Sequence, residues 1–293
     1  MSSEEPSNTR NTWGLSAEDY RRRMAEKARQ PAPASPPFDG GSPLASTSVR
    51  TTGRITWRPD EVNFDLIGES STERSLYRLQ RSMPLLVWNA AALEGNTFTL
   101  PQVHTLLDGV TVGGKRIEEA EQILALSEAM NLMVAAVHDG SFSLSKSFSD
   151  RVHGIVAQHE AIEAGNFRVE GMVHGGGAVR IAAGGTVDGD PAGETGEHLR
   201  ADFENLIAAL GTLSDPRARA LVYFCSATRS QFYFDGNKRT ARIMMTGALV
   251  HAGYEPVNIP FARQEEFNTA LDVLFTTDDA TALLDFLTTC SLP

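Results

Sequence analysis

The sequence has little cysteine, a deficit of positive charge and no long uncharged apolar run. Its two cysteines, Cys225 and Cys290, cannot form a disulfide framework and are too few for a cysteine-based zinc site. Both lie in apolar stretches, so we expect buried thiols. No apolar run approaches the roughly 20 residues that span a bilayer, and the first residues lack the apolar core of a secretory signal. These absences predict a cytoplasmic protein with no membrane partner.

The charge balance is acidic, with 26 Lys and Arg against 37 Asp and Glu and a formal charge of -11. A general nucleic-acid binder normally presents a net basic face, so no nucleic-acid partner is expected. The 293 residues are 41% hydrophobic and 22% charged, which is ordinary for a globular protein. This length suits one large domain or two small ones.

The first 56 residues are expected to be a disordered or linker segment. The first 60 residues contain seven of the 14 prolines, and residues 30–48 are rich in Pro, Ser and Gly. Such a composition buries too little apolar surface to offset its ordering entropy. Within this segment, residues 16–29 predict a short charged helix, either solvated or docking on a partner. The folded domain is expected over residues 57–293.

From about Ser71 the apolar spacing predicts a mostly helical, all-α fold. The longest predicted helix has one apolar face, formed by Ile117, Ala120, Ile123, Leu124, Ser127, Met130, Val134 and Val137. Further helices are predicted near 101–108, 144–160, 199–210, 215–230, 237–252, 262–274 and 279–289. In one segment, residues 166–181, apolar and polar residues instead alternate, and three consecutive glycines stand at 175–177. This pattern predicts a small β-hairpin, followed by a loop over 182–197.

Residues 231–242, QFYFDGNKRTAR, carry the clearest chemical signal. Asp235-Gly236-Asn237 can begin a helix, whose free N–H groups and dipole attract anions. Lys238, Arg239 and Arg242 lie in its first turns, which suits a polyphosphate, and Asp235 could hold a bridging Mg²⁺. The alternative is a hairpin signal, FYF followed by Asp-Gly, with the cations tolerated at a surface cost of a few tenths of a kcal/mol.

This segment resembles the signature of the Fic (Fido) family, H-x-F-x-D/E-G/A-N-G/K-R-x-x-R. The matching residues are Asp235, Gly236, Asn237, Lys238, Arg239 and Arg242. Tyr233 replaces the usual Phe, and Gln231 stands where the family has its catalytic His. Lys238 stands where most members have Gly, although a subgroup that includes the Doc toxin has Lys there.

Two other segments resemble motifs of the same family, and they occur along the chain in the order in which the family has them. Gly165-Asn166-Phe167-Arg168 is similar to the opening of the family's β-hairpin flap. Residues 90–96, AAALEGN, resemble the end of an N-terminal inhibitory helix, with Ala90 in place of Ser or Thr and the helix ending near residue 95. The resemblance therefore runs from about residue 70 to 290.

The resemblance implies transfer of AMP from ATP, or from another nucleoside triphosphate, to a protein hydroxyl. It assigns Mg²⁺ to Asp235, the α- and β-phosphates to Gly236 and Asn237, the β-phosphate to Arg239 and the γ-phosphate to Arg242. It pairs Glu94 with Arg242 in an inhibited state. Strand addition to the flap would hold an unknown target protein, through Phe167, Arg168, Val169, Met172 and Val173.

Gln231 departs most from the family pattern, because an amide cannot accept a proton near neutral pH but can still hydrogen-bond a hydroxyl. Loss of a general base typically costs about 10²–10⁴-fold in rate. Lys238 adds a cation beside the phosphates; in the Lys-bearing subgroup the nucleotide can bind reversed, with transfer of the γ-phosphate. Three hypotheses follow: a nucleotide-binding protein impaired in AMP transfer, an active transferase with an unusual base, and a non-catalytic interaction module. A homodimer through the apolar C-terminal helices also stays open.

Overall fold

The computed structural model describes residues 48–182 and 184–292. The predicted helix at 16–29 and most of the predicted linker lie outside the described residues. The cysteine prediction is confirmed, since Cys225 and Cys290 are both buried free thiols.

The described part of the chain is mostly helical, which confirms the predicted fold class. Its α-helices are α2 (Thr72–Arg81), α3 (Met83–Ala92), α4 (Leu100–Leu107), α5 (Ile117–Asp139), α6 (Lys146–Val156), α7 (Glu197–Gly211), α8 (Pro216–Ser230), α9 (Asn237–His251), α10 (Gln264–Thr277) and α11 (Thr281–Thr288). Short 3₁₀ helices are η1 (Pro59–Glu61), η2 (Phe64–Leu66) and η3 (Phe261–Arg263). Helix starts follow capping chemistry: the Ser71 hydroxyl accepts the Arg74 N–H at 3.2 Å, and the Asp215 carboxylate accepts the Arg217 N–H at 2.8 Å.

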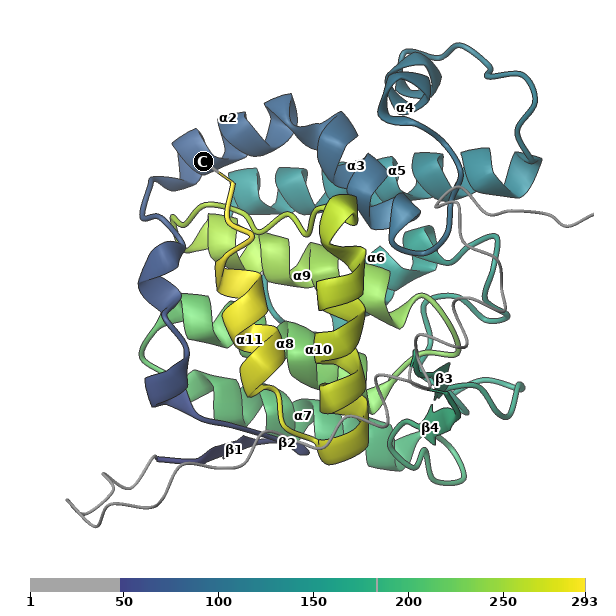
Figure 1. The fold of residues 1–293 in the computed structure, drawn as a ribbon. Helices are drawn as coiled ribbons and strands as arrows, with labels where there is room; N and C mark the ends of the chain where they lie inside the picture. Colours follow the sequence, from purple (N-terminus) through teal and green to yellow (C-terminus); the bar gives the residue numbers. More distant parts are fainter. Residues whose placement is uncertain (1–47, 183, 293) are drawn as a thin grey trace, which may run out of the picture. The chain divides into compact units, whose positions relative to one another are not determined.

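Helices α8 and α9 form the centre of the core and lie side by side (Figure 1). Helices α5 and α6 pack against α9, while α7, α10 and α11 pack against α8. Both central helices are buried around most of their circumference. The turn between them is therefore held from several sides, which matters for the site described below.

Helix α5 differs in part from its predicted apolar face. Ile123, Met130, Val134 and Val137 are buried as predicted, but Ile117 is 74% exposed. By length and composition α5 is apolar enough to cross a membrane, although half of its most apolar window is buried within the structure. It packs against α3, α6 and α9, as the core helix of a folded domain does.

The folded part begins earlier than residue 57. Strands β1 (Arg50–Thr52) and β2 (Ile55–Trp57) form an antiparallel hairpin, and the side chain of Ile55 is fully buried. The backbone of Thr56 also exchanges hydrogen bonds with the segment between α10 and α11. The predicted linker boundary is therefore wrong for residues 50–56, because one apolar side chain, Ile55, was too little to stand out in a polar sequence.

The hairpin among the helices exists but lies further along the chain than predicted. Strands β3 (Ala178–Arg180) and β4 (Thr186–Asp188) pair antiparallel, with Val179 opposite Val187. The glycines at 175–177 all have positive φ and precede β3 instead of forming the turn. Residues 166–177 form no strand. The prediction of strands over 166–181 was wrong in position because the alternation at its start reflects core packing of Phe167, described below.

Candidate active site

The turn between α8 and α9 has two left-handed residues at its ends. Gln231, the C-cap of α8, has φ 54°, and Gly236, the N-cap of α9, has φ 73°. A left-handed glutamine is uncommon and costs backbone energy, so the surrounding structure must hold it there. A Cβ on Gly236 would lie 3.2 Å from the Ala157 Cβ. Glycine therefore suits position 236 for both its conformation and its close packing.

A buried histidine fixes the start of α9. The His153 Nε2 lies 2.8 Å from the Asp235 carbonyl oxygen, and the Gly165 N–H donates to His153 Nδ1 at 2.8 Å. The ring stacks on Tyr233 at 3.8 Å. Burial lowers the pKa of His153 to about 4. A neutral ring that accepts at Nδ1 donates at Nε2, so His153 ties the turn to the segment after α6.

The Gln231 side chain is held in one orientation. Its Nε2 donates to the Thr228 carbonyl at 2.6 Å, and its Oε1 accepts from Asn237 Nδ2 at 3.0 Å. Asn237 in turn donates to the Tyr233 carbonyl and accepts the Tyr233 N–H, both at 2.8 Å. Gln231 is only 7% exposed. The amide is thus integrated into the turn between α8 and α9.

A cavity of about 310 Å³ opens at this turn. Its walls come from the end of α3, from β3 and from the start of α9. The lining residues are Glu94, Ala178, Val179, Arg180, Gln231, Phe234, Asp235, Gly236, Asn237, Lys238 and Arg239. The structure therefore brings the predicted catalytic, metal, nucleotide-binding and inhibitory residues together around one cavity, with the exception of Arg242, whereas none of the five predicted docking residues lines it. This arrangement offers helix N–H groups and three cations, Arg180, Lys238 and Arg239, to an anion.

Glu94 forms its ion pair with Lys238. Its Oε2 lies 2.9 Å from the Lys238 Nζ, while its Oε1 is buried without a hydrogen-bond partner. Burial disfavours the Glu94 carboxylate, but Lys238, then Arg242 and Arg239, outweigh burial and lower its pKa below the ordinary value. The expected hydrogen-bonded pair of Glu94 and Arg242 is not what the structure contains. Lys238, about one helical turn before Arg242 on α9, pairs with the carboxylate instead.

Arg239 forms an ion pair with Glu160, a residue that the sequence did not single out. Its two terminal nitrogens both bind the carboxylate of Glu160, one of them at 2.8 Å. Glu160 follows α6 and lies 79 residues before Arg239 in the chain. Burial opposes the charge on Arg239, but the Glu160 contacts outweigh it and raise the pKa of the guanidinium. No local sequence signal marks Glu160, because only the packing of α6 on α9 brings it here.

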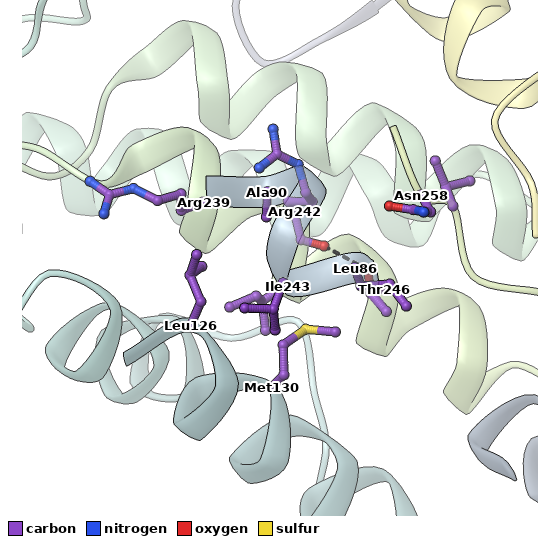
Figure 2. A pocket seen from close by; sticks show the side chains of 11 residues that line it. Leu86, Ala90, Leu126, Met130, Arg239, Arg242, Ile243, Thr246 and Asn258 are labelled. Atoms are coloured by element: carbon purple, nitrogen blue, oxygen red, sulfur yellow. Dashed lines mark hydrogen bonds between the residues drawn. The ribbon is translucent and has the colours of Figure 1, made fainter. Parts of the chain in front are cut away.

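Arg242 is buried beside the cavity but does not line it. It is 7% exposed, and none of its three side-chain nitrogens has a hydrogen-bond partner among the described residues. It borders a separate cavity of about 20 Å³ together with Arg239. Figure 2 shows both guanidinium groups turned away from Leu126, Ile243 and Met130, three of the apolar residues that line that cavity. A buried guanidinium without hydrogen-bond partners is costly, and here the Phe267 ring, with its centroid 5.9 Å from the Arg242 Cζ, and longer-range attraction from Glu94 offset part of that cost.

The predicted docking residues divide into those that hold the fold together, Phe167 and Arg168, and those that are at least partly exposed, Val169, Met172 and Val173. Phe167 is 1% exposed and stacks on Phe232, so it belongs to the core and cannot hold a target. Arg168 donates to the carbonyls of Gln231 and Asp190, each at 2.6 Å, and so holds the base of the flap. Val169 and Val173 are half-buried, and Met172 is 90% exposed.

The residues present fit a magnesium ion held mainly by phosphate. Asp235 is 62% exposed at the cavity wall, and its Oδ1 accepts the Gly236 N–H at 2.6 Å. Among residues 48–182 and 184–292, no group of three or more His, Cys, Asp or Glu side chains gathers to hold a metal. Mg²⁺ often uses one carboxylate with phosphate oxygens and water, so a single Asp is sufficient for that arrangement.

The chain is similar to proteins named protein adenylyltransferase Fic. It is 29% identical to the one from Drosophila erecta over 184 residues, which are 62% of this chain and 35% of that protein. It is 27% identical to the one from Aedes aegypti over 220 residues, which are 74% and 42%. The chain thus spans about two fifths or less of the length of these relatives. No model of a known protein family matches it.

Solved structures agree on the fold. A Fic-domain signalling protein from Bacteroides thetaiotaomicron superposes with a TM-score of 0.62 at 23% identity, covering 78% of this chain and 88% of that one. Residues 134–508 of Fic-1 from C. elegans give a TM-score of 0.58 at 22% identity, covering 78% and 64%.

Proposed function

This chain carries a Fic domain, and from that premise we propose that it binds ATP with Mg²⁺ at the start of α9. AMP transfer to a protein hydroxyl is then weakened by Gln231 and restrained by Glu94. The observation that carries this proposal is the cavity in which Gln231, Glu94 and the cations of α9 meet. The relatives named adenylyltransferases favour AMP as the transferred group.

The phosphates would lie at the N-terminus of α9, against Gly236, Asn237 and Lys238. The N–H groups there and the helix dipole stabilise anions. Asp235 would hold Mg²⁺, which supplies charge neutralisation between the phosphates. A second cavity of about 210 Å³ adjoins the first, since Val179, Arg180 and Lys238 line both. Its apolar wall, with Leu271 and Phe275 from α10, suits a nucleoside.

Gln231 would leave the target hydroxyl without a base. Its amide oxygen already accepts from Asn237, and its nitrogen donates to Thr228. An amide in this position can orient a hydroxyl but cannot take its proton. The expected loss relative to a histidine is about 10²–10⁴-fold in rate.

Glu94 would compete with the phosphates for Lys238. A carboxylate 2.9 Å from the ammonium occupies the position that a phosphate oxygen would take. Its lowered pKa keeps Glu94 ionised near neutral pH. Restraint of this kind needs no further partner, because the carboxylate belongs to the same chain.

The test is transfer of label from ATP carrying a radioactive α-phosphate, in the presence of Mg²⁺. The native chain, Glu94→Gly and Glu94→Gly/Gln231→His are compared, with self-labelling and labelling of a cell lysate scored separately. We expect strong labelling from the double variant alone. This outcome would show that position 231 limits the chemistry.

Strong labelling by Glu94→Gly alone would refute the assignment of Gln231 as the defect and would favour an active, autoinhibited transferase. No labelling by either variant would argue against AMP transfer. A γ-labelled ATP sample then tests phosphoryl transfer, and direct ATP binding tests the remaining alternative of an interaction module.

A further inference from the structure

The cations at the start of α9 are matched by an equal number of carboxylates. Lys238 is paired with Glu94, and Arg239 is paired with Glu160 through both terminal nitrogens. A third carboxylate, that of Asp235, has its Oδ1 3.9 Å from a terminal nitrogen of Arg239. With Arg242 counted, the three cations of α9 are balanced by three carboxylates, and Arg180 of β3 adds a fourth positive charge to the cavity wall. The balanced charges of α9 weaken its attraction for a polyphosphate, whatever the geometry of the helix N-terminus.

The Glu160 pair has the geometry of a competitor for phosphate. Guanidinium groups bind carboxylate and phosphate with the same bidentate fork, so the two anions occupy the same donors. Arg239 is 5% exposed and lines the cavity, while the Glu160 side chain is 28% exposed. The carboxylate is therefore the partner that can move aside into solvent, and the arginine is the partner that stays.

A hydrogen-bond relay connects Glu160 to the segment that carries Glu94. Asn96 Nδ2 donates to Gln122 Oε1 at 2.9 Å, and Gln122 Nε2 donates to Glu160 Oε1 at 3.1 Å. Asn96 follows Glu94 by two residues. Gln122 lies on α5 and bridges this segment and the end of α6. One short segment thus provides the carboxylate on Lys238 and supports the carboxylate on Arg239.

We propose that Glu160 is a second inhibitory carboxylate, which competes with nucleotide phosphate for Arg239 and is held in place by Asn96 and Gln122. The inference rests on the proposed ATP site. Displacing the segment around Glu94 would remove one carboxylate from Lys238 and loosen the other from Arg239. The two releases would therefore reinforce each other.

The test is calorimetric titration of the full chain with ATP and Mg²⁺. The variants are Glu94→Gln, Glu160→Gln, their combination and Gln122→Ala, with Glu204→Gln as a control that removes an equal charge from the exposed face of α7. The Glu160→Gln amide keeps the shape of the carboxylate, and a melting curve for each variant confirms folding. Loss of a charged hydrogen-bond competitor predicts about tenfold tighter binding for each single Glu→Gln variant.

The double Glu→Gln variant should bind most tightly, Gln122→Ala should tighten binding less than Glu160→Gln, and Glu204→Gln should match the native chain. If Glu94→Gln tightens binding while Glu160→Gln leaves it unchanged or weaker, Glu160 only positions Arg239 and the inference is wrong, although the ATP site stands. If no variant binds ATP, the inference and the proposed function both fail.

Discussion

The buried His153 makes the stability of this domain sensitive to mild acid. Its pKa is about 4 in the folded chain, against an ordinary value of 6.5. A histidine whose folded pKa is depressed stabilises the fold above its unfolded pKa, and this contribution is lost as the pH falls from about 6.5 towards 4. Each pKa unit is worth about 1.4 kcal/mol. The loss should reach about 2 kcal/mol at pH 5 and about 3 kcal/mol at pH 4.

The assay is urea unfolding of the native chain and of His153→Gln at pH 7.5, 5 and 4. Other groups also titrate in this range, so the informative quantity is the difference in unfolding free energy between the two proteins. That difference should shrink by about 3 kcal/mol between pH 7.5 and pH 4. His104→Gln, an exposed histidine on α4, serves as the control. A difference that stays constant with pH would refute the assignment of a neutral, buried His153.

Two further predictions concern packing. Ile55→Ala removes a fully buried side chain from β2 and should lower the free energy of unfolding by about 2–4 kcal/mol, measured by urea titration; a value near zero would contradict the early start of the fold. Gly189→Ala would place a Cβ 2.6 Å from both the Gln231 Cβ and the Ser230 carbonyl oxygen. It should lower the melting temperature clearly, whereas Gly211→Ala, where a Cβ meets nothing within 4 Å, should not.

The helices were predictable because their apolar spacing repeats over many residues, and the turn at 231–236 was predictable from its signature residues. The hairpin was misplaced because alternation in residues 166–173 does not distinguish a strand from a segment pinned by one buried aromatic. Phe167 packs on Phe203 and Phe232, which lie 36 and 65 residues further along the chain. Such contacts leave no local pattern.

The carboxylates that pair with Lys238 and Arg239 could not be predicted from the sequence either. Lys238 and Arg242 lie one helical turn apart on α9, and the choice between them depends on where α3 ends relative to that helix. The Glu160 pair depends on the packing of α6 against α9. Residue types predict a phosphate site at the start of α9, but the ion pairs across helices could be found only from the fold.

The position of Glu94 beyond the last residue of α3 determines how its carboxylate can leave Lys238. Three backbone hydrogen bonds hold the turn at residues 94–96 to α3, from the N–H groups of Glu94 and Asn96 to the Ala91 carbonyl and from Gly95 to Ala92, and the Asn96 side chain adds bonds to Glu119 and Gln122 of α5. Opening this turn breaks these few bonds at the end of α3 and leaves the rest of that helix in place. Such local opening costs far less than global unfolding. Amide hydrogen exchange at these three residues should therefore be faster than in α3 itself, and it reports how often the site is unmasked.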